Sequence, residues 1–507
     1  MNERCDVAVI GCGPVGALAA NLLGRAGLRV VVLEKEREHY PLPRAVHLDH
    51  EMMRLFQTAG VIDRVLADMV ATDGHLHVGA DHGVIRYMGT VGKPKPFGWS
   101  NDYFFYQPEL EAHLRAAFAD NGAIDLRLGA TFTALEQQGD GVTVHYDQDG
   151  ASHTLAARWV IATDGARSPV RKALGIALDD LDFEEPWLVV DAEVEGPVTF
   201  PPITGVPADA DLQRLSVMMC DPARPATVVP GRGNHRRWEF MLLPGEDDQA
   251  MMQPEKVREL VAAWMKDVPH TIVRAATYRF HGLVAERWQA GNVFLAGDAA
   301  HQTPPFFGQG MCHGLRDVAN LAWKMDAIAN HGADPAILDT YQPERDPHVR
   351  GVIGAAVAAG RYICELDPAK AAARDAAIRA TAAQKAGETA HDLIPAIATG
   401  LVMPSPAAGA RFIQPILADG RKLDDVAGQG WRLFVRDDSV TGTSPLVTRL
   451  VAASLDDAGA VTAWLDAHGV DAVLLRPDHC VFGTASGTGV DLIEARARAL
   501  GLALETA

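Results

Sequence analysis

A β-branched run near the N-terminus passes directly into a turn with three regularly spaced glycines. Residues 7–10 (Val-Ala-Val-Ile) have the pattern of a buried parallel strand. Gly11, Gly13 and Gly16 follow at G-x-G-x-x-G spacing, and residues 17–26 predict a helix. Gly11 permits the tight turn, Gly13 lets the backbone approach a phosphate, and Gly16 lets helix and strand pack closely. The order of these elements indicates a dinucleotide-binding domain of the α/β class.

The elements after this helix strengthen that interpretation. Residues 29–33 predict a second strand, and Glu34 stands at its end, followed by Lys35. An acidic side chain at this place accepts hydrogen bonds from an adenosine ribose. We therefore expect the nucleotide to contact Glu34 and Lys35 as well as the turn, including Pro14 and Val15. A lone G-x-G-x-x-G could be a chance loop, and this half of the chain does not separate FAD from NAD.

A second glycine-rich stretch lies far downstream. Residues 292–296 predict another buried strand, which ends at Gly297 and Asp298. A carboxylate at the end of a central strand can bind a polyol chain, and a glycine-rich helix start such as residues 308–310 directs N–H groups toward negative charge. A reduced flavin carries negative charge on its pyrimidine edge. Asp298 alone could be a turn aspartate or a helix cap, but together with the first motif it indicates bound FAD.

Chain length and charge set outer limits. A chain of 507 residues is too long for one core, so two or three domains are expected. The formal net charge of −19 argues against nucleic acid or an anionic membrane as a partner. No apolar stretch is long enough to span a membrane, and Asp6 interrupts the N-terminal apolar run, which argues against a signal peptide. The six cysteines form no C-x-x-C pair, which favours a cytoplasmic location and predicts no metal site.

The sequence pattern changes between the two motifs. From residue 187 to residue 244, strand-like runs alternate with Pro- and Gly-rich turns, as in an antiparallel sheet. A sheet that lies over a bound cofactor can form the wall of a substrate pocket. Farther along, the Ala-rich residues 368–389 predict a helix, and strand and helix patterns return beyond residue 403.

Taken together, these motifs resemble those of the class A flavoprotein aromatic hydroxylases, which have the p-hydroxybenzoate hydroxylase fold. The resemblance rests on residues 11–16 with Glu34, on Asp164-Gly165, and on residues 297–301 (Gly-Asp-Ala-Ala-His). It covers essentially the whole chain, and stretches such as residues 237–241 are most similar to the 3-(3-hydroxyphenyl)propionate hydroxylases. The motif set is specific for the family and only weakly specific for the substrate.

The resemblance implies a Rossmann-like FAD-binding domain of the GR2 type, interleaved with an antiparallel substrate-binding sheet and followed by a thioredoxin-like domain. The expected FAD-binding segments are residues 1–75, 108–183 and 281–345, and the expected sheet segments are residues 76–107 and 184–280. Residues 346–402 are expected to form a helical connector, and residues 403–507 the thioredoxin-like domain. Because this last domain has no C-x-x-C, thiol–disulfide chemistry is excluded there, and packing or homodimer formation is its expected role.

Roles for individual residues are implied in the same way. Gly11, Gly13, Gly16 and Glu34 are expected to hold the ADP part of FAD. Further expected contacts are Arg44 (FAD and the nicotinamide donor), Gln107 (ribityl chain), Asp164 and Gly165 (FAD and the reduced pyridine nucleotide), Gly297 and Asp298 (ribityl chain), Pro305 (its carbonyl at the reactive flavin edge), and Gly308, Gly310 and Met311 (pyrimidine ring). Arg44 could instead form a surface pair, and Gln107 could be a helix cap.

The implied activity is that of a monooxygenase. NADH or NADPH reduces FAD, dioxygen forms a C4a-hydroperoxyflavin, and the distal oxygen passes to a phenolic ring. Only one G-x-G-x-x-G has a strand–helix context, so the nicotinamide donor is expected to dock transiently. A flavin-dependent halogenase, another FAD oxidoreductase on the same scaffold and a non-catalytic redox sensor are the alternatives. The W-x-W-x-I-P run of the halogenases is absent from this sequence.

The substrate side is less well specified. Pro305 and His313 are the catalytic candidates, the first through its carbonyl group and the second through pocket polarity; a base or proton relay for the phenol is also expected. Other side chains that could face the pocket are His301, Gln302, Phe306, Phe307, Met218, Met219 and Met241, although core packing is the more usual role of the apolar ones. A substrate carboxylate could meet Arg224, Arg232, Arg236 or Arg237, among which the sequence does not discriminate.

Overall fold

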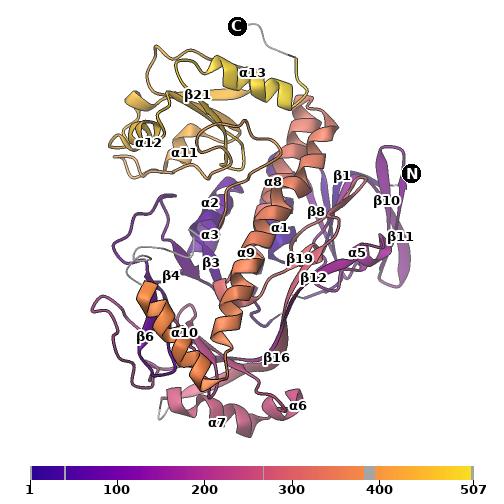
Figure 1. Ribbon diagram of the computed structural model, residues 1–507. Coiled ribbons are helices and arrows are strands. Elements are labelled where there is room, and N and C mark those ends of the chain that lie inside the picture. Colours follow the sequence, from indigo (N-terminus) through magenta and orange to yellow (C-terminus); the bar gives the residue numbers. More distant parts are fainter. Residues whose placement is uncertain (1–2, 39–40, 266–267, 382–393, 504–507) are drawn as a thin grey trace.

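Two eight-stranded sheets and a four-stranded C-terminal sheet organise the chain (Figure 1). The computed structural model describes residues 3–38, 41–265, 268–381 and 394–503. The C-terminal unit lies at one end of the molecule, and two long helices, α8 (Gly310–His331) and α9 (Tyr341–Ile363), run between it and the sheets (Figure 1). The mixed α/β fold that the sequence predicts is confirmed.

The first sheet contains the predicted nucleotide-binding strands. Its members are β1 (Glu3–Ile10), β2 (Val30–Glu34), β8 (Ile124–Leu128), β9 (Thr131–Gln138), β10 (Gly141–Gln148), β11 (Ala151–Ala162), β17 (Gln289–Ala290) and β18 (Val293–Leu295). The main path has the order β17-β18-β11-β1-β2-β8, and β1 pairs in parallel with both β2 and β11. Helix α1 (Pro14–Arg25) follows β1 and packs against α4 (Gln107–Ala116) and α8. The predicted strands at residues 7–10, 29–33 and 292–296 all lie in this sheet.

The second sheet is antiparallel, as the sequence predicts, except for one parallel pair of strands. Its members are β5 (Gly74–Val78), β6 (Val84–Gly89), β12 (Leu178–Val194), β13 (Ser216–Met219), β14 (Ala226–Pro230), β15 (His235–Met241), β16 (His270–Ala285) and β19 (His301–Gln302). Their order is β19-β16-β12-β15-β14-β13-β5-β6, and β13 pairs in parallel with β5. Strands joined by a hairpin must be antiparallel, but β5 and β13 belong to distant segments of the chain, so no turn fixes their relative direction.

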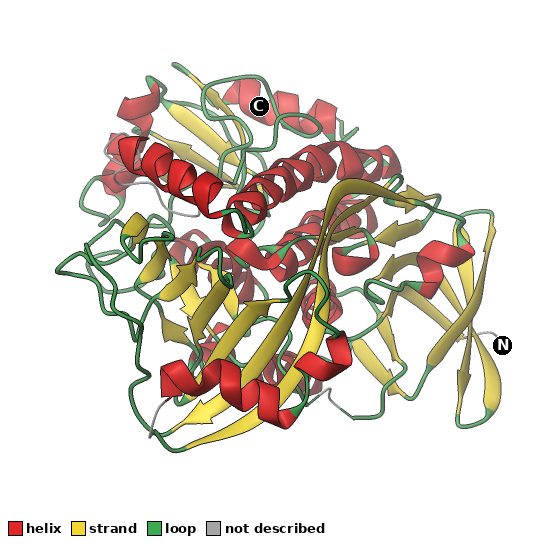
Figure 2. Cartoon of the chain, turned by 60° about the horizontal axis from the view of Figure 1, so that its bottom comes forward, coloured by secondary structure: helices red, strands yellow, loops and turns green. Residues whose placement is uncertain are grey.

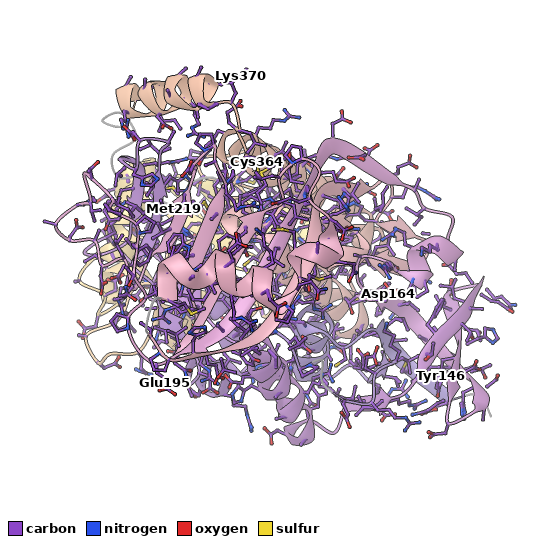
Figure 3. All side chains as sticks on the ribbon, turned by 90° about the horizontal axis from the view of Figure 1, so that it is seen from below. Tyr146, Asp164, Glu195, Met219, Cys364 and Lys370 are labelled. Atoms are coloured by element: carbon purple, nitrogen blue, oxygen red, sulfur yellow. The ribbon has the colours of Figure 1, made fainter. Side chains whose placement is uncertain are left out.

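The two faces of the second sheet have different surroundings. One face is covered by α6 (Asp248–Met251) and α7 (Pro254–Met265), which cross the strands in Figure 2. Trp238 and Phe240 point to this side and form a core with Trp264 of α7. Met219 belongs to the same core and is labelled in Figure 3, which is seen from this side. Because side chains alternate along a strand, the neighbouring residues of β15 point to the opposite face.

Two long strands of the second sheet cross expected domain boundaries. β12 has 17 residues and β16 has 16, and the two pair along most of their length. The expected domain boundaries at residues 183/184 and 280/281 fall inside these strands, and the boundary at 75/76 falls inside β5. Continuous strands therefore connect the parts that the sequence pattern assigns to different domains.

Shorter elements complete this region. They are β3 (His47–Asp49), β4 (Val70–Ala71), β7 (Asp102–Phe104), α2 (His50–Thr58), α3 (Ile62–Leu66), α5 (Pro169–Ala173) and α10 (Pro368–Thr381). The Ala-rich helix predicted at 368–389 is present as α10, and residues 382–389 lie outside the described residues. Among the helices of the described ranges, none combines the length and the apolar character that a bilayer crossing needs.

The C-terminal unit is a small α/β layer. It contains β20 (Trp431–Val435), β21 (Val447–Val451), β22 (Ala472–Leu475) and β23 (Val481–Ala485) with helices α11 (Leu423–Ala427), α12 (Ala460–His468) and α13 (Val490–Ala499). The strand order is β21-β20-β22-β23, in which β20 and β21 are parallel and the other pairs antiparallel.

Buried ion pairs fasten this unit to the rest of the chain. Arg54 of α2 donates from Nε to Asp424 Oδ2 at 2.6 Å, and Arg432 of β20 reaches the same carboxylate at 2.8 Å. Burial alone would raise the pKa of Asp424, but the positive charges around it hold that pKa far below the usual range. A second cluster joins Glu344 of α9 to Arg476 at 2.8 Å and to Lys324 at 3.1 Å, all without solvent exposure. The C-terminal unit is therefore an integral part of the fold.

The first prediction concerns this attachment. Asp424→Asn leaves the buried guanidinium groups of Arg54 and Arg432 without their carboxylate, so the free energy of unfolding should fall by roughly 3 kcal/mol. Thermal unfolding followed by circular dichroism measures the change. The matched control is Asp419→Asn, which removes a carboxylate from an exposed pair with Arg421 and should leave the midpoint in place. Equal midpoints for the two variants would contradict the assigned role of Asp424.

Candidate functional site

A cavity of about 410 Å³ lies between the first glycine turn and the second sheet. Most of the predicted cofactor residues line it: Gly13, Pro14, Val15, Arg44, Gln107, Gly165, Gly297, Asp298, Pro305, Gly308, Gly310 and Met311. Gly11, Gly16, Glu34, Lys35 and Asp164 lie outside the lining. The opposite wall is the face of the second sheet that points away from α7.

The glycine turn before α1 has the geometry of a phosphate cradle. Gly11 has φ +95°, and a Cβ atom there would lie 2.6 Å from the carbonyl oxygen of Thr163. A Cβ atom at Gly16 would lie 2.0 Å from the carbonyl oxygen of Gly11, so the predicted close packing is present. Gly13 instead faces open space and is the N-cap of α1, where no side chain caps the helix. The first N–H groups of α1 are therefore left for a ligand, and the positive helix end favours an anionic one.

A second helix N-terminus meets the same cavity. Gly308 has φ +62°, and a Cβ atom there would lie 2.4 Å from Nδ1 of His47, so only glycine fits this close approach. The 22-residue helix α8 begins at Gly310, and Gln309 at its N-cap makes no side-chain cap. Because Gly308, Gly310 and Met311 line the cavity, the positive end of α8 faces it.

Two carboxyl groups at strand ends retain unused hydrogen-bonding capacity. Asp298 follows β18, and its carboxyl group is exposed to the cavity. Asp164 follows β11 and accepts a hydrogen bond from Val170 N at 3.0 Å through Oδ2. Its Oδ1 is buried and has no hydrogen-bond partner in the described structure, and burial raises the pKa of this carboxyl group. Hydroxyl groups of a ribityl chain or a ribose could donate to both carboxyl groups.

Glu34 and Lys35 lie beside the glycine turn. Glu34 is buried and accepts hydrogen bonds from Cys12 N at 2.7 Å and from Glu36 N at 2.9 Å. Lys35 points to solvent and pairs with Glu36 at 3.5 Å. The contact of Glu34 with Cys12 ties the end of β2 to the turn, which places its carboxylate next to the turn backbone.

Gln107 holds the loop that carries Arg44. Its Oε1 accepts hydrogen bonds from Arg44 N at 3.2 Å and from Ala45 N at 2.7 Å, while its Nε2 donates to Glu111 at 2.7 Å. The side chain makes no cap of α4. Arg44 itself lines the cavity.

Side chains of the second sheet donate hydrogen bonds to the same loop from the other side. Arg237 of β15 donates to the carbonyl oxygens of Arg44 at 2.6 Å and Pro43 at 2.8 Å. Asp191 of β12, which is fully buried, holds this guanidinium with hydrogen bonds of 2.8 and 3.1 Å. Arg274 of β16 also donates to Pro43 and lies 3.7 Å from Asp191. Every guanidinium nitrogen of Arg237 thus donates within the protein, and Arg274 donates to the same loop.

A histidine–aspartate cluster on the cavity wall was not foreseen from the sequence. His47 and His75 line the cavity, and His47 Nε2 lies 2.9 Å from Oδ1 of the buried Asp102. Burial alone would lower the pKa of His47, but the hydrogen bond and charge of Asp102 raise it above the usual value. Burial lowers the pKa of His75 to about 4. The three residues come from β3, β5 and β7, so no local spacing in the sequence reveals them.

Potential ligand atoms of these three side chains lie within 4.8 Å of one another. One Asp102 oxygen is already bonded to His47, which makes the arrangement a hydrogen-bonded dyad with a second imidazole beside it. The absence of a metal site stays a prediction.

The other candidates for the substrate pocket divide into two groups. Met218, Phe306 and Arg237 line the cavity, whereas the remaining ones do not: Met219, Met241, His301, Gln302, Phe307, His313, Arg224, Arg232 and Arg236. Arg224 pairs with Glu246 and Arg232 with Glu109.

His313 is enclosed within the protein rather than at the cavity. It lies in α8 with no solvent exposure, and the rings of His301 and His348 are each 5.8 Å from its own. Burial lowers its pKa well below the usual value. This position gives no support to a role in the polarity of the pocket.

Several further side chains on the sheet face complete the wall. They are Val189, Ser216, Thr227, Val229, Glu239, Tyr278 and Phe280. Side chains alternate between the two faces of a strand, so the sequence could have distinguished these residues from those under α7. This would have required knowing the strand register and which face meets the cavity.

Known proteins share this architecture. The FAD binding domain family matches residues 4–356. The chain is 35% identical to a 3-(3-hydroxyphenyl)propionate/3-hydroxycinnamic acid hydroxylase of Burkholderia vietnamiensis, over 98% of this chain and 96% of that protein. It is also 35% identical to a probable NADH-specific resorcinol 4-hydroxylase of Rhodococcus jostii, over 95% and 92%.

Solved structures agree in fold. The flavin-dependent monooxygenase PieE, in complex with FAD and substrate, superimposes with a TM-score of 0.82 at 24% identity and covers 99% of both chains. The anhydrotetracycline hydroxylase OxyS of Streptomyces rimosus gives 0.77 at 25% identity, over 98% of this chain and 99% of that one. The chain thus belongs to the FAD-binding family of class A flavoprotein hydroxylases, and it is an FAD-dependent aromatic monooxygenase.

Proposed function

We propose that the protein hydroxylates a small phenol in the cavity between the glycine turn and the second sheet, with NADH as the reductant. One observation carries this proposal: a single cavity is lined by two uncapped helix N-termini and by a histidine that is paired with a buried aspartate. The helix N-termini suit an anionic cofactor, and the histidine–aspartate pair suits a group that must lose a proton. NADH is preferred because a relative with similar coverage is named as NADH-specific.

The cofactor wall would hold FAD at three places. The N–H groups after Gly13 would receive the pyrophosphate, with Glu34 near the adenosine ribose. Asp298 would accept hydrogen bonds from the ribityl chain. The start of α8 would place its N–H groups against the pyrimidine ring, and the carbonyl group of Pro305 would face the reactive edge. When bound, FAD takes electrons from NADH and activates dioxygen, which is the chemistry that amino-acid side chains do not supply.

The substrate wall would activate the phenol. His47 is the proton acceptor in this account, because it faces the cavity and Asp102 fixes the orientation of its ring and stabilises its protonated form. A phenol that shares its proton with His47 has a more electron-rich ring and reacts more readily with an electrophilic oxygen. Met218, Phe280 and Phe306 supply apolar surface that excludes water from this reaction.

We also propose a thioredoxin-like origin for the C-terminal unit, on the support of its mixed four-stranded sheet with flanking helices. It contains no C-x-x-C. Its buried ion pairs with α2 and α9 favour a packing role.

Turnover with a panel of phenols tests the proposed activity. Purified protein with FAD should oxidise NADH faster when resorcinol or 3-(3-hydroxyphenyl)propionate is added, and should yield one hydroxylated product per NADH consumed. A redox sensor would show no stimulation, and a halogenase would require halide. NADH oxidation that yields only hydrogen peroxide with every phenol would contradict the proposal.

The second prediction concerns the pH dependence. His47 must be neutral to accept a proton, so kcat/KM should fall as the pH decreases through the pKa of His47, which lies above its usual value. Asp102→Asn removes the interactions that raise this pKa, and burial then lowers it. The acidic limb of the profile should therefore shift to lower pH in this variant, with a smaller maximal rate. An unchanged acidic limb would exclude the dyad as its source.

The third prediction concerns FAD retention. Asp298→Ala removes the carboxyl group that faces the cavity, and the purified variant should contain little FAD, measured as the ratio of flavin absorbance to protein absorbance. Asp140→Ala changes an exposed carboxylate at the turn between β9 and β10 and serves as the control. Full flavin content in Asp298→Ala would refute its assigned role.

A further inference from the structure

The histidine–aspartate dyad lies on a very small sheet. His47 belongs to β3 and Asp102 to β7, which pair over three residues, and the two-residue strand β4 pairs with the other edge of β7. His47 Nε2 lies 2.9 Å from Asp102 Oδ1. Because so small a sheet has little stability of its own, the relative position of the two side chains depends on the segments packed around it.

The C-terminal unit holds the segment that leads into β7. Residues 90–101 join β6 to β7 and form neither helix nor strand. Gln414, which is fully buried, donates from its backbone N–H group to Pro96 O and from Nε2 to Phe97 O, both at 2.7 Å. Gly98 has φ +69°, and a Cβ atom there would lie 3.0 Å from the carbonyl oxygen of Gln414. The loop and the C-terminal unit are therefore in close contact immediately before the dyad aspartate.

The same loop lies between the C-terminal unit and α2. The ammonium group of Lys422 is 3.7 Å from the ring centroid of Trp99, and Trp99 Nε1 donates to Gln57 of α2 at 3.3 Å. The rings of Phe97 and His50, the first residue of α2, are 4.4 Å apart. A displacement of the C-terminal unit would therefore be transmitted to the loop that carries the dyad aspartate.

The dyad histidine is connected to the C-terminal unit by a second route. β3 continues directly into α2, which lies beside the C-terminal unit in Figure 1. Arg54 in the middle of α2 bonds to Asp424, and Thr58 at its end lies 2.7 Å from His479 Nε2. Both segments that carry the dyad thus contact the C-terminal unit, although none of the described residues of that unit lines the cavity.

We propose that the C-terminal unit positions the histidine–aspartate dyad, with Gln414 as the positioning residue on the side of Asp102 and Asp424 on the side of His47. This inference rests on the proposed function, in which His47 accepts the proton of the phenol. A hydrogen bond weakens steeply when its length and angle depart from the optimum. Releasing one of the two segments would loosen the bond between His47 and Asp102 without altering either residue.

Nuclear magnetic resonance of the FAD-loaded protein tests this inference without turnover. The pKa of His47 is followed in protein with isotope-labelled histidine, and His47→Gln identifies its signal. The charged and titratable groups that act on His47 are Asp102 of β7, Asp49 of its own strand with its partner Arg316 of α8, and His75 of β5. All of them are present in the variants that follow.

Two substitutions weaken the contact between the C-terminal unit and the loop. Gln414→Leu removes the side-chain donor to Phe97 O, and the pKa of His47 should fall by about one pH unit, toward its value in Asp102→Asn. Lys422→Met removes the charge that lies over Trp99 and should lower the same pKa by a smaller amount. This milder variant decides the question if Gln414→Leu does not fold.

Glu344→Gln is the control, because it weakens the attachment of the C-terminal unit to α9, away from the dyad segments. It should lower the unfolding midpoint and leave the pKa of His47 at the wild-type value. A wild-type pKa of His47 in both loop-contact variants, or an equal fall in Glu344→Gln, would overturn the inference.

The acidic limb of kcat/KM should move with the pKa of His47 in each variant. A wild type that hydroxylates no phenol would refute the proposed function, whereas the pKa values would still decide whether the C-terminal unit positions the dyad. The two failures can therefore be told apart.

Discussion

The arrangement of the site depends on one hydrogen-bonded seam between the second sheet and the nucleotide-binding part. Asp191 orients Arg237, Arg237 holds the carbonyl oxygens of the loop at residues 43–44, and Gln107 holds the N–H groups of the same loop. Behind Gln107, Glu111 lies 3.5 Å from Arg115, which donates to the carbonyl oxygen of Cys12 in the glycine turn. The chain of contacts therefore runs from the substrate wall to the phosphate cradle. Because Asp191, Arg237, Gln107 and Glu111 are buried, the hydrogen bonds that link the two walls are largely shielded from water.

This seam explains why the two walls of the cavity differ in charge. It engages the guanidinium group of Arg237 in structural contacts and bonds Arg274 to Pro43, and the sheet face otherwise presents mainly apolar and neutral side chains together with Glu239 of β15. The opposite wall presents two helix N-termini, whose partial positive charge has no side-chain cap. An anionic cofactor and an aromatic substrate would then find complementary surfaces in one cavity. A water-poor space of this kind also protects a reactive oxygen species from unproductive decay.

Sequence reasoning located the cofactor wall better than the substrate wall, for a physical reason. The cradle is built from contiguous segments in which strand, glycine turn and helix follow one another, so local spacing carries the information for residues 11–16 and for the start of α8. The substrate wall is built from one to three residues of each of several strands that are distant in sequence, and its composition depends on register and on which strand face meets the cavity. His47, His75 and Asp102 come from three short strands with no shared motif. The parallel pairing of β5 and β13 is likewise set by tertiary packing, so the predicted antiparallel arrangement is correct for the other pairs of this sheet and fails for this one.

The central claim is that this cavity couples NADH oxidation to the insertion of an oxygen atom into a phenolic ring. The most direct measurement supplies the FAD-loaded protein with NADH, a phenol that stimulates turnover, and dioxygen labelled with oxygen-18. The account predicts one labelled oxygen atom in each molecule of hydroxylated product, as read by mass spectrometry. A hydroxylated product that carries oxygen from water, or labelled hydrogen peroxide with an unmodified phenol, would contradict it.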